Sequence, residues 1–554
     1  MAPARAATPC TVPPVTFPTD LMTPGMTGVG HTVIRGTTVV PFDVEILGVL
    51  RDAIFLGVDI VVAEITGPAD FLEETGGAAG GMSGSPIIID GKLAGALAWR
   101  IAEDRHLFGM TAAEDMVGIF DLEDADPTSV PSRIQLSRQV IEAARASGSM
   151  LTDTAALESL PLPLGVSGNV PVTLSEIEES FAERGIRVAA FRSGSVASPT
   201  AQTFDPSPFL PGEGLGVGLS FGDVSFYTFG TTTAVCGDVA LGFGHPGFFG
   251  GGEVSIAMTD VDVIGIDNGL FGGTKIGTLG DTHGLLTQDR FAGVAGLFGV
   301  MPTLVPITSD VSSPDTGLSR HGVTDVTWDD EGFMAEVAYY HAFRNFSYAL
   351  QSEEAGGTID FHWTIEGTRE DGSTFTVENR WFEATEFGVP FRVFRMVDAM
   401  YELAFNPFEP IEFTSVDIGG DITEEQLVAR IGRVRTSSSL QPRLASRSVL
   451  RARPGDRITI EVTLNPTEDG STSVATMTFR LPAGAGGRQH ISLKGGGGRP
   501  DRFQRPRSFD DLLDALNGGD HANDLIARGF GRSVLQAQDV EVKGRASVTV
   551  QIVR

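Results

Sequence analysis

A glycine-rich loop around Ser83 carries the residues best suited to chemistry. The segment Gly80–Pro86 reads GGMSGSP, and a serine nucleophile needs a free hydroxyl beside backbone N–H groups that face the developing oxyanion. Glycines on both sides of the serine permit the tight turn that would direct the amides of Gly81 and Ser83 into one oxyanion hole. Most loops of this composition are plain turns between strands, so the short motif leaves both interpretations open.

The longer sequence around this loop resembles the SpoIVB-type peptidases of bacterial sporulation. In that family an E-T-G-G segment precedes G-M-S-G-S-P, and an apolar strand, a Gly-Lys turn and a Gly-Ala strand follow. Residues 73–97 keep this order, and residues 109–116 resemble the end of the same unit. The resemblance implies a chymotrypsin-like serine endopeptidase that forms an acyl-enzyme, acts on few protein substrates and can cleave itself.

The same resemblance identifies His245 as the general base. The family's histidine lies in an A-L-G-H run, which Val239–His245 (VALGFGH) matches with two inserted residues, and Lys275–Gly299 keeps the spacing that follows. Here the serine half precedes the histidine half, the reverse of the family order. We therefore expect a circular permutation, since geometry rather than chain order defines such sites. His31 is the alternative base because it is close to Ser83 in sequence.

The acidic member of the triad is open between two residues. Asp289 follows His245 by roughly 45 residues, the separation found in a chymotrypsin-like barrel, although an ion pair with Arg290 would explain it equally well. Asp70 lies two residues from the position that matches the family's aspartate. The only cysteines, Cys10 and Cys236, would form one disulfide in an exported protein or remain two free thiols.

Composition and charge exclude several classes of function. The net charge of −31 repels phosphate backbones, so no nucleic-acid partner is expected. Dispersed histidines and the lack of a phosphate-loop motif predict no metal and no cofactor. No apolar run reaches the roughly 18 residues of a membrane span. Residues 1–7 resemble the remnant of a signal cleavage site, so we expect export to the periplasm, cell surface or medium. The family resemblance implies a bacterial protein.

Abundant glycine, with 69 residues, and frequent β-branched residues predict a mainly β fold. We expect a double β-barrel peptidase core, then β-sandwich modules and a small α+β segment. The expected segments are a serine-bearing barrel half (12–120), a connection with short helices (121–213), a histidine-bearing barrel half (214–308), β-sandwich modules (323–480), and a linker with a small helical and strand segment (481–554). Individual expectations include strands over 32–40 and 332–340 and helices over 132–148, 174–184, 508–516 and 520–528.

The alternative function is a binding or scaffolding protein that keeps the peptidase fold without activity, since fold alone does not give activity. The region after residue 323 is large and has no catalytic motif, so we expect it to bind a protein partner. Its arginine cluster, Arg430–Arg457, would suit an acidic one, although solvated strand faces explain such clusters more often. Retention of both Ser83 and His245 favours catalysis on a protein or peptide substrate.

Overall fold

The computed structural model describes residues 14–55, 57–121, 133–168, 170–248, 253–269, 272–467, 471–497 and 506–553. Strands dominate the regular structure, which confirms the mainly β class. The chain forms two compact units: one runs to Val305 and includes Thr324–Asp330, and the other comprises Pro306–Val323 and the residues from Glu331 onward.

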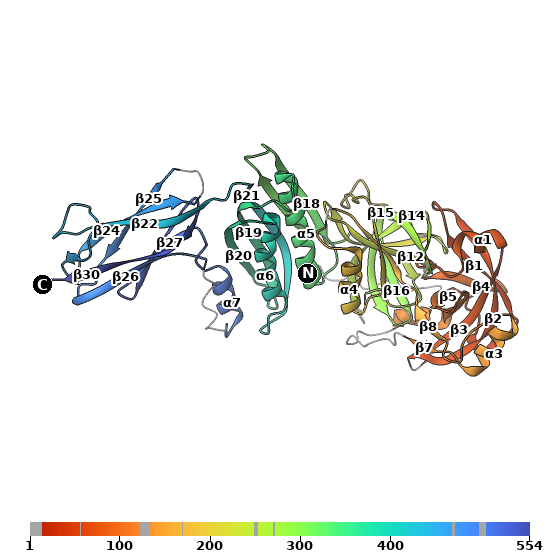
Figure 1. Ribbon diagram of the computed structural model, residues 1–554. Helices are drawn as coiled ribbons and strands as arrows, with labels where there is room; N and C mark the ends of the chain where they lie inside the picture. Colours follow the sequence, from red (N-terminus) through yellow and green to blue (C-terminus); the bar gives the residue numbers. More distant parts are fainter. Residues whose placement is uncertain are drawn as a thin grey trace. The chain divides into compact units, whose positions relative to one another are not determined.

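The serine half of the first unit is a closed ring of six antiparallel strands. These strands are coloured red to orange in Figure 1. Around the ring the order is β1, β2, β3, β6, β5 and β4, and β4 pairs again with β1. The strands are β1 (Thr27–Val33), β2 (Val39–Phe55), β3 (Val58–Gly67), β4 (Ser85–Ile89), β5 (Lys92–Ile101) and β6 (Asp104–Ala112). Alternate side chains, among them Phe42, Val61 and Phe108, are fully buried in one core, as expected for half-buried strands.

Two turns in this half show how local sequence sets the strand ends. Asp90 and Gly91 both have positive φ (49° and 72°), the conformation that a two-residue hairpin between β4 and β5 needs. The strand expected over 32–40 is wrong, because β1 ends at Val33 and a turn through Gly36, with φ of 63°, separates it from β2.

The histidine half is a second closed ring of six strands. Its order is β12, β13, β16, β15, β14 and β11, and β11 pairs again with β12. The strands are β11 (Gly214–Gly222), β12 (Phe226–Cys236), β13 (Val239–Gly242), β14 (Glu253–Gly269), β15 (Gly272–Arg290) and β16 (Gly293–Phe298). Large aromatic residues, including Phe221, Tyr227 and Phe229, fill its core.

The connection between the halves contains helices α3 (Arg138–Ala146) and α4 (Leu174–Glu183), which lie within the expected ranges. It also adds strands that the sequence did not predict. β8 (Ala156–Ser159) pairs with β5 of the serine half, and β9 (Leu162–Val166) pairs with β12 of the histidine half. The connection is therefore part of both sheets rather than a plain linker.

The second unit begins with an α/β layer instead of the expected β-sandwich. Strands β17 (Val305–Ser312), β21 (Ile411–Thr423), β19 (Gly357–Arg369) and β20 (Thr374–Thr385) lie side by side, and helices α5 (Glu331–Leu350) and α6 (Phe394–Ala404) contact each other beside them. The strand expected over 332–340 is wrong, because those residues form the first half of α5. Their apolar residues fit period two over a short window, but the helix is buried on most sides, and periodicity cannot distinguish the two cases.

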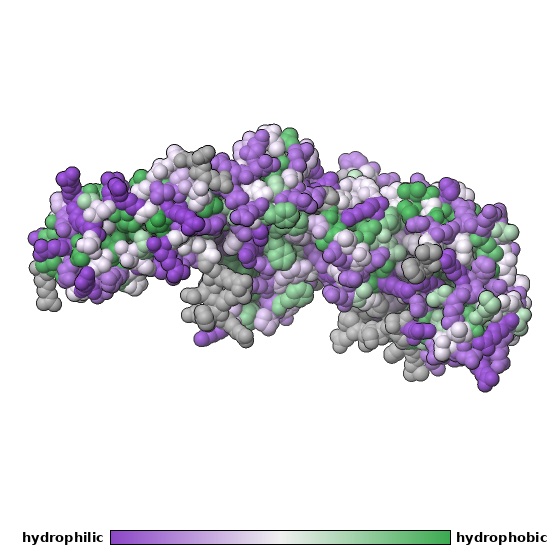
Figure 2. Space-filling model, in the orientation of Figure 1, coloured by the Kyte–Doolittle hydropathy of each residue, from purple (hydrophilic) through white to green (hydrophobic). Residues whose placement is uncertain are grey.

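Residues from Val428 to Ile552 form two further sheets around one core, in the order β25-β24-β22-β29 and β23-β30-β26-β27-β28. Their bounds are β22 (Val428–Ser437), β23 (Leu450–Ala452), β24 (Arg457–Pro466), β25 (Ser473–Arg480), β26 (Gly487–Gly495), β27 (Asp524–Gly529), β28 (Arg532–Ala537), β29 (Glu541–Lys543) and β30 (Arg545–Ile552). The helix expected over 520–528 is wrong, since β27 begins at Asp524 and the residues before it are not helical. Hydrophilic and apolar residues alternate over the visible face of this region (Figure 2).

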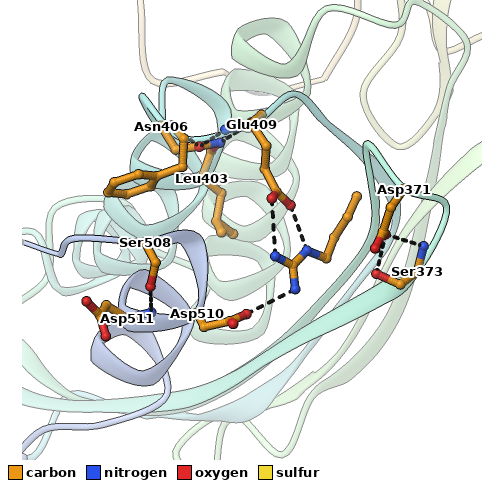
Figure 3. A network of polar contacts seen from close by, with 10 residues as sticks. Asp371, Ser373, Leu403, Asn406, Glu409, Ser508, Asp510 and Asp511 are labelled. Atoms are coloured by element: carbon orange, nitrogen blue, oxygen red, sulfur yellow. Dashed lines mark hydrogen bonds and ion pairs between the residues drawn. The ribbon is translucent and has the colours of Figure 1, made fainter.

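The short helix α7 (Phe509–Leu516) begins where the sequence predicts. The Ser508 hydroxyl accepts from the Asp511 amide at 3.1 Å, which satisfies one of the free N–H groups of the first turn. Arg369 attaches the helix to the α/β layer. Its guanidinium donates to Glu409 at 2.6 and 3.1 Å and to Asp510 at 3.0 Å. Figure 3 labels both carboxylates, and dashed lines join them to the guanidinium between them.

Candidate active site

The loop that carries Ser83 connects helix α1 (Ala69–Thr75) to β4. Gly81 and Gly84 have backbone φ angles of 85° and 98°, which residues other than glycine rarely adopt. Space is also closed at Gly84, because a Cβ there would lie 1.9 Å from the carbonyl oxygen of Thr231. The glycines predicted to shape the loop are thus required by its backbone and by its contact with β12.

The loop places the Ser83 hydroxyl against His245. Ser83 Oγ lies 2.8 Å from His245 Nε2, and both side chains are buried, with 0% and 2% exposure. His245 Nδ1 lies 2.8 Å from the carbonyl oxygen of Pro246. Because a carbonyl oxygen can only accept, Nδ1 carries the proton and Nε2 is left to accept from the serine.

Burial sets the charge of this histidine. It lowers the pKa of His245 to about 4, and the hydrogen bond to Pro246 offsets this only in part, because an imidazolium loses its hydration in the interior. His245 is therefore neutral near pH 7, which is the state a general base requires.

Two backbone amides beside Ser83 are available to a ligand. Within the described part of the chain, neither the Gly81 nor the Ser83 N–H has a hydrogen-bond acceptor, whereas the Met82 amide between them donates to Ala79 O at 3.0 Å. The orientation of both free amides is fixed, because the carbonyl group of the same peptide accepts a hydrogen bond. Gly80 O accepts from Lys275 N at 2.9 Å, and Met82 O accepts from the Ser85 hydroxyl at 2.7 Å.

This loop lies in the part of the chain that a known family describes. Residues 19–117 match the family model SpoIVB peptidase S55. The S55 match covers the six-stranded ring of the serine half with Ser83 and both free amides, and it ends well before His245. No curated protein and no solved structure matches the chain.

Thr231 and Thr233 of the histidine half hold the Ser83 loop in place. Thr231 donates through its amide to Ser83 O at 2.7 Å and through its hydroxyl to Gly81 O at 3.0 Å. Thr233 donates its hydroxyl to Gly84 O at 2.7 Å. Neither residue was expected from the sequence, although a run of three threonines on a strand buried on both faces was a signal for them.

The serine half in turn holds the loop that carries His245. The Thr111 hydroxyl donates to the carbonyl oxygen of Gly244, directly before His245, and itself accepts from Trp99 Nε1 at 3.1 Å. Thr111 belongs to the Gly-Met-Thr motif that resembles the end of the family's serine unit, but its role was not predicted. Each half therefore positions the loop that carries the other half's reactive group.

Neither candidate acid is hydrogen-bonded to the imidazole of His245. The Asp289 carboxylate is fully buried and accepts from the amides of Gly247 and Phe248, at 2.9 and 2.5 Å. Asp70 is exposed at the start of α1 and accepts from the Phe71 amide. Among described residues, the hydrogen bonds of His245 go to Ser83 and Pro246 alone.

The remaining predicted site residues lie elsewhere. His31 is on β1, opposite Pro41, and Ser83 Oγ has no hydrogen bond to it. Cys236, at the end of β12, is disulfide-bonded, and its predicted partner Cys10 lies outside the described residues. Across the described ranges, no group of three or more His, Cys, Asp or Glu side chains is arranged to hold a metal ion. None of the helices in the described ranges is both long and apolar enough to cross a membrane.

Proposed function

We propose that this protein is a serine endopeptidase of the SpoIVB-like type with Ser83 as nucleophile and His245 as general base. The observation that carries the proposal is the 2.8 Å contact between Ser83 Oγ and the unprotonated Nε2 of a neutral histidine. The two acceptor-free amides beside the serine and the S55 match over this half support the same conclusion.

In the proposed reaction, His245 Nε2 takes the hydroxyl proton as Ser83 Oγ attacks the carbonyl carbon of a peptide bond. The amides of Gly81 and Ser83 then donate to the oxyanion of the tetrahedral intermediate. His245 returns the proton to the leaving amine, and water hydrolyses the acyl-enzyme by the same steps. We assign Asp289 a positioning role, because it fixes the backbone that follows His245 rather than the imidazole itself.

A circular permutation accounts for the chain order. The serine and histidine halves are each a six-stranded ring, and their loops are held by reciprocal hydrogen bonds that do not depend on which ring comes first. Chemistry of this type is defined by the geometry of the groups. The reversed order of the halves relative to the family is thus compatible with the proposed mechanism.

Burial of both reactive side chains supports a narrow range of protein substrates, self-cleavage included. A peptide bond reaches Ser83 only after the structure around it opens, so substrates that promote this opening are favoured. The disulfide at Cys236 supports export, because such bonds persist mainly outside the cytosol.

The test is covalent labelling with a fluorophosphonate probe, followed by mass analysis of the labelled peptide. We expect labelling at Ser83 in the wild type and its loss in Ser83→Ala and His245→Ala. The matched control is Ser309→Ala. Ser309 Oγ lies 2.9 Å from His341 Nε2 and is also buried, but it lies within strand β17, whose backbone pairs with β21. Labelling that survives Ser83→Ala would contradict the proposal.

A further inference from the structure

Lys275 on β15 is a buried cation without a counter-ion. Its side chain is 1% exposed, and its Nζ lies 2.9 Å from Thr32 Oγ1 and 3.4 Å from Thr231 Oγ1. No carboxylate of the described residues forms an ion pair with it. Burial of an unpaired ammonium is costly and therefore rare, so its presence calls for an explanation at the site it occupies.

The site is the back of the loop that carries the two free amides. The backbone N–H of Lys275 donates to Gly80 O at 2.9 Å. This carbonyl belongs to the same planar peptide as the Gly81 N–H, and in a trans peptide the two groups point in opposite directions. The hydrogen bond from Lys275 therefore fixes the direction of the Gly81 N–H.

The side chain of Lys275 reaches the next peptide of the loop. Its aliphatic part packs against Gly81, where a Cβ would lie 3.0 Å from Lys275 Cδ. Its ammonium donates toward the Thr231 hydroxyl, which in turn donates to Gly81 O at 3.0 Å. Lys275 thus contacts the loop through its backbone, its stem and its charge.

We propose that Lys275 is a positioning residue of the oxyanion hole, whose uncompensated ammonium also favours the negative charge that develops on the substrate carbonyl oxygen. This inference rests on the proposed peptidase function. It adds Lys275, which takes no part in the proton transfers between Ser83 and His245. A cation placed in a dry site acts strongly on a nearby developing charge because little solvent screens it.

The surroundings of Lys275 leave its charge sensitive to pH. Burial alone lowers its pKa to about 7. The facing groups of β1 and β12 are the neutral hydroxyls of Thr32 and Thr231. None of the charged or titratable residues on the adjacent strands contributes to the shift, and these include His31 on β1 and Asp260, Asp262 and Asp267 on β14. The ammonium is therefore lost as the pH rises through about 7.

The experiment compares Lys275→Met with Lys92→Met, which removes an exposed lysine from β5. The first measurement is the rate constant for fluorophosphonate bond formation at Ser83 between pH 5 and 9, separated from reversible probe binding. We expect wild type and Lys92→Met to slow above about pH 7. Lys275→Met should react roughly 10- to 100-fold more slowly at pH 6, with unchanged probe binding and no decline above pH 7. A rate within twofold of wild type, or a decline that persists in Lys275→Met, would overturn the role.

The second measurement does not depend on activity. An unfolded lysine keeps its proton up to about pH 10.4, so the wild type gains stability relative to Lys275→Met as the pH rises from about 7. We expect the difference in Tm, Lys275→Met minus wild type, to decrease steadily from pH 6 to pH 9. A constant difference would show that Lys275 is not a buried ammonium. A wild type that shows this trend but no labelling at Ser83 would instead contradict the peptidase function, and with it the oxyanion role.

Discussion

At the scale of single residues, the site is governed by burial more than by charge pairs. His245 lies against Trp99 and Phe243, with ring centroids 6.3 Å apart in both pairs, and accepts from Ser83 without a carboxylate at its other nitrogen. Its neutral form is favoured by the apolar surroundings, while the Pro246 carbonyl selects the tautomer. The sequence pointed to Ser83 and His245, and the structure places their side chains in hydrogen-bond contact. Chain spacing alone did not reveal whether a carboxylate would reach the imidazole.

The pH dependence of labelling follows from this burial. Since the folded pKa of His245 lies at about 4, below its usual 6.5, the base is unprotonated and active above about pH 4. We expect Ser83 labelling to persist at pH 5 and to be lost as the pH falls through about 4, as measured by initial labelling rates from pH 3.5 to 7. A half-maximal rate near pH 6.5 would mean that the histidine is hydrated in the reacting state.

Asp289 is predicted to act on activity through the backbone. Asp289→Asn keeps one acceptor oxygen but places an NH₂ group against a backbone N–H. We expect a loss of about 1–3 kcal/mol of unfolding free energy and a labelling rate reduced about 10-fold or more, with unchanged reversible probe binding. Thermal unfolding and labelling kinetics test both effects. An inactive variant of unchanged stability would instead indicate a direct role at the imidazole.

At the scale of elements, threonine hydroxyls of each ring donate to backbone carbonyls in the loop of the other ring. The sequence predicted the strands that flank the loops of Ser83 and His245, because glycine and proline turns and the family motifs mark their ends. It could not predict which strands of one ring lie against the loop of the other, because pairing between distant segments leaves no local pattern. The first half of α5 was mistaken for a strand for a different reason, because a helix buried on most sides has no distinctive hydrophobic period. The start of α7 at Ser508 is marked by a local signal and was predicted correctly.

Thr111→Val tests this exchange of contacts. Valine has nearly the shape of threonine but leaves the Gly244 carbonyl and the Trp99 N–H without partners, so we expect a loss of about 1–3 kcal/mol of stability and slower labelling at Ser83. Chemical denaturation and labelling rates are the measurements. Thr66→Val, at an exposed position of β3, is the control and should change neither. Equal behaviour of the two variants would contradict the role of Thr111.

At the scale of the whole molecule, the reactive residues and the contacts that position them all lie within the first unit. The second unit has its own apolar core and its own polar network, in which Glu409 and Asp510 hold the guanidinium of Arg369 (Figure 3). These carboxylates raise the pKa of Arg369 further above its ordinary value. Variants of the second unit should accordingly lower the stability of that unit without changing labelling at Ser83.

Arg369→Met is predicted to separate the two units in their response. It removes the ion pairs that attach α7 to the α/β layer and leaves Glu409 without its cation. We expect a lower Tm for the transition of the second unit and an unchanged labelling rate at Ser83, measured by calorimetry and by probe labelling on the same preparation. Arg138→Met, which removes an exposed i,i+4 pair with Glu142 on α3, serves as the control for loss of a surface charge. Slower labelling in Arg369→Met would show that the units are coupled.

The absence of room at Gly84 has a consequence for how related sequences can diverge. A side chain there would collide with the carbonyl oxygen of Thr231 and the backbone nitrogen of Phe243, at 1.9 and 2.6 Å, and both belong to the other ring. Substitution of Gly84 therefore requires that the backbone at Thr231 and at Phe243 both move away. Homologues that share the site should keep glycine here in either order of the halves, and one that lacks it should show compensating changes near residues 231 and 243.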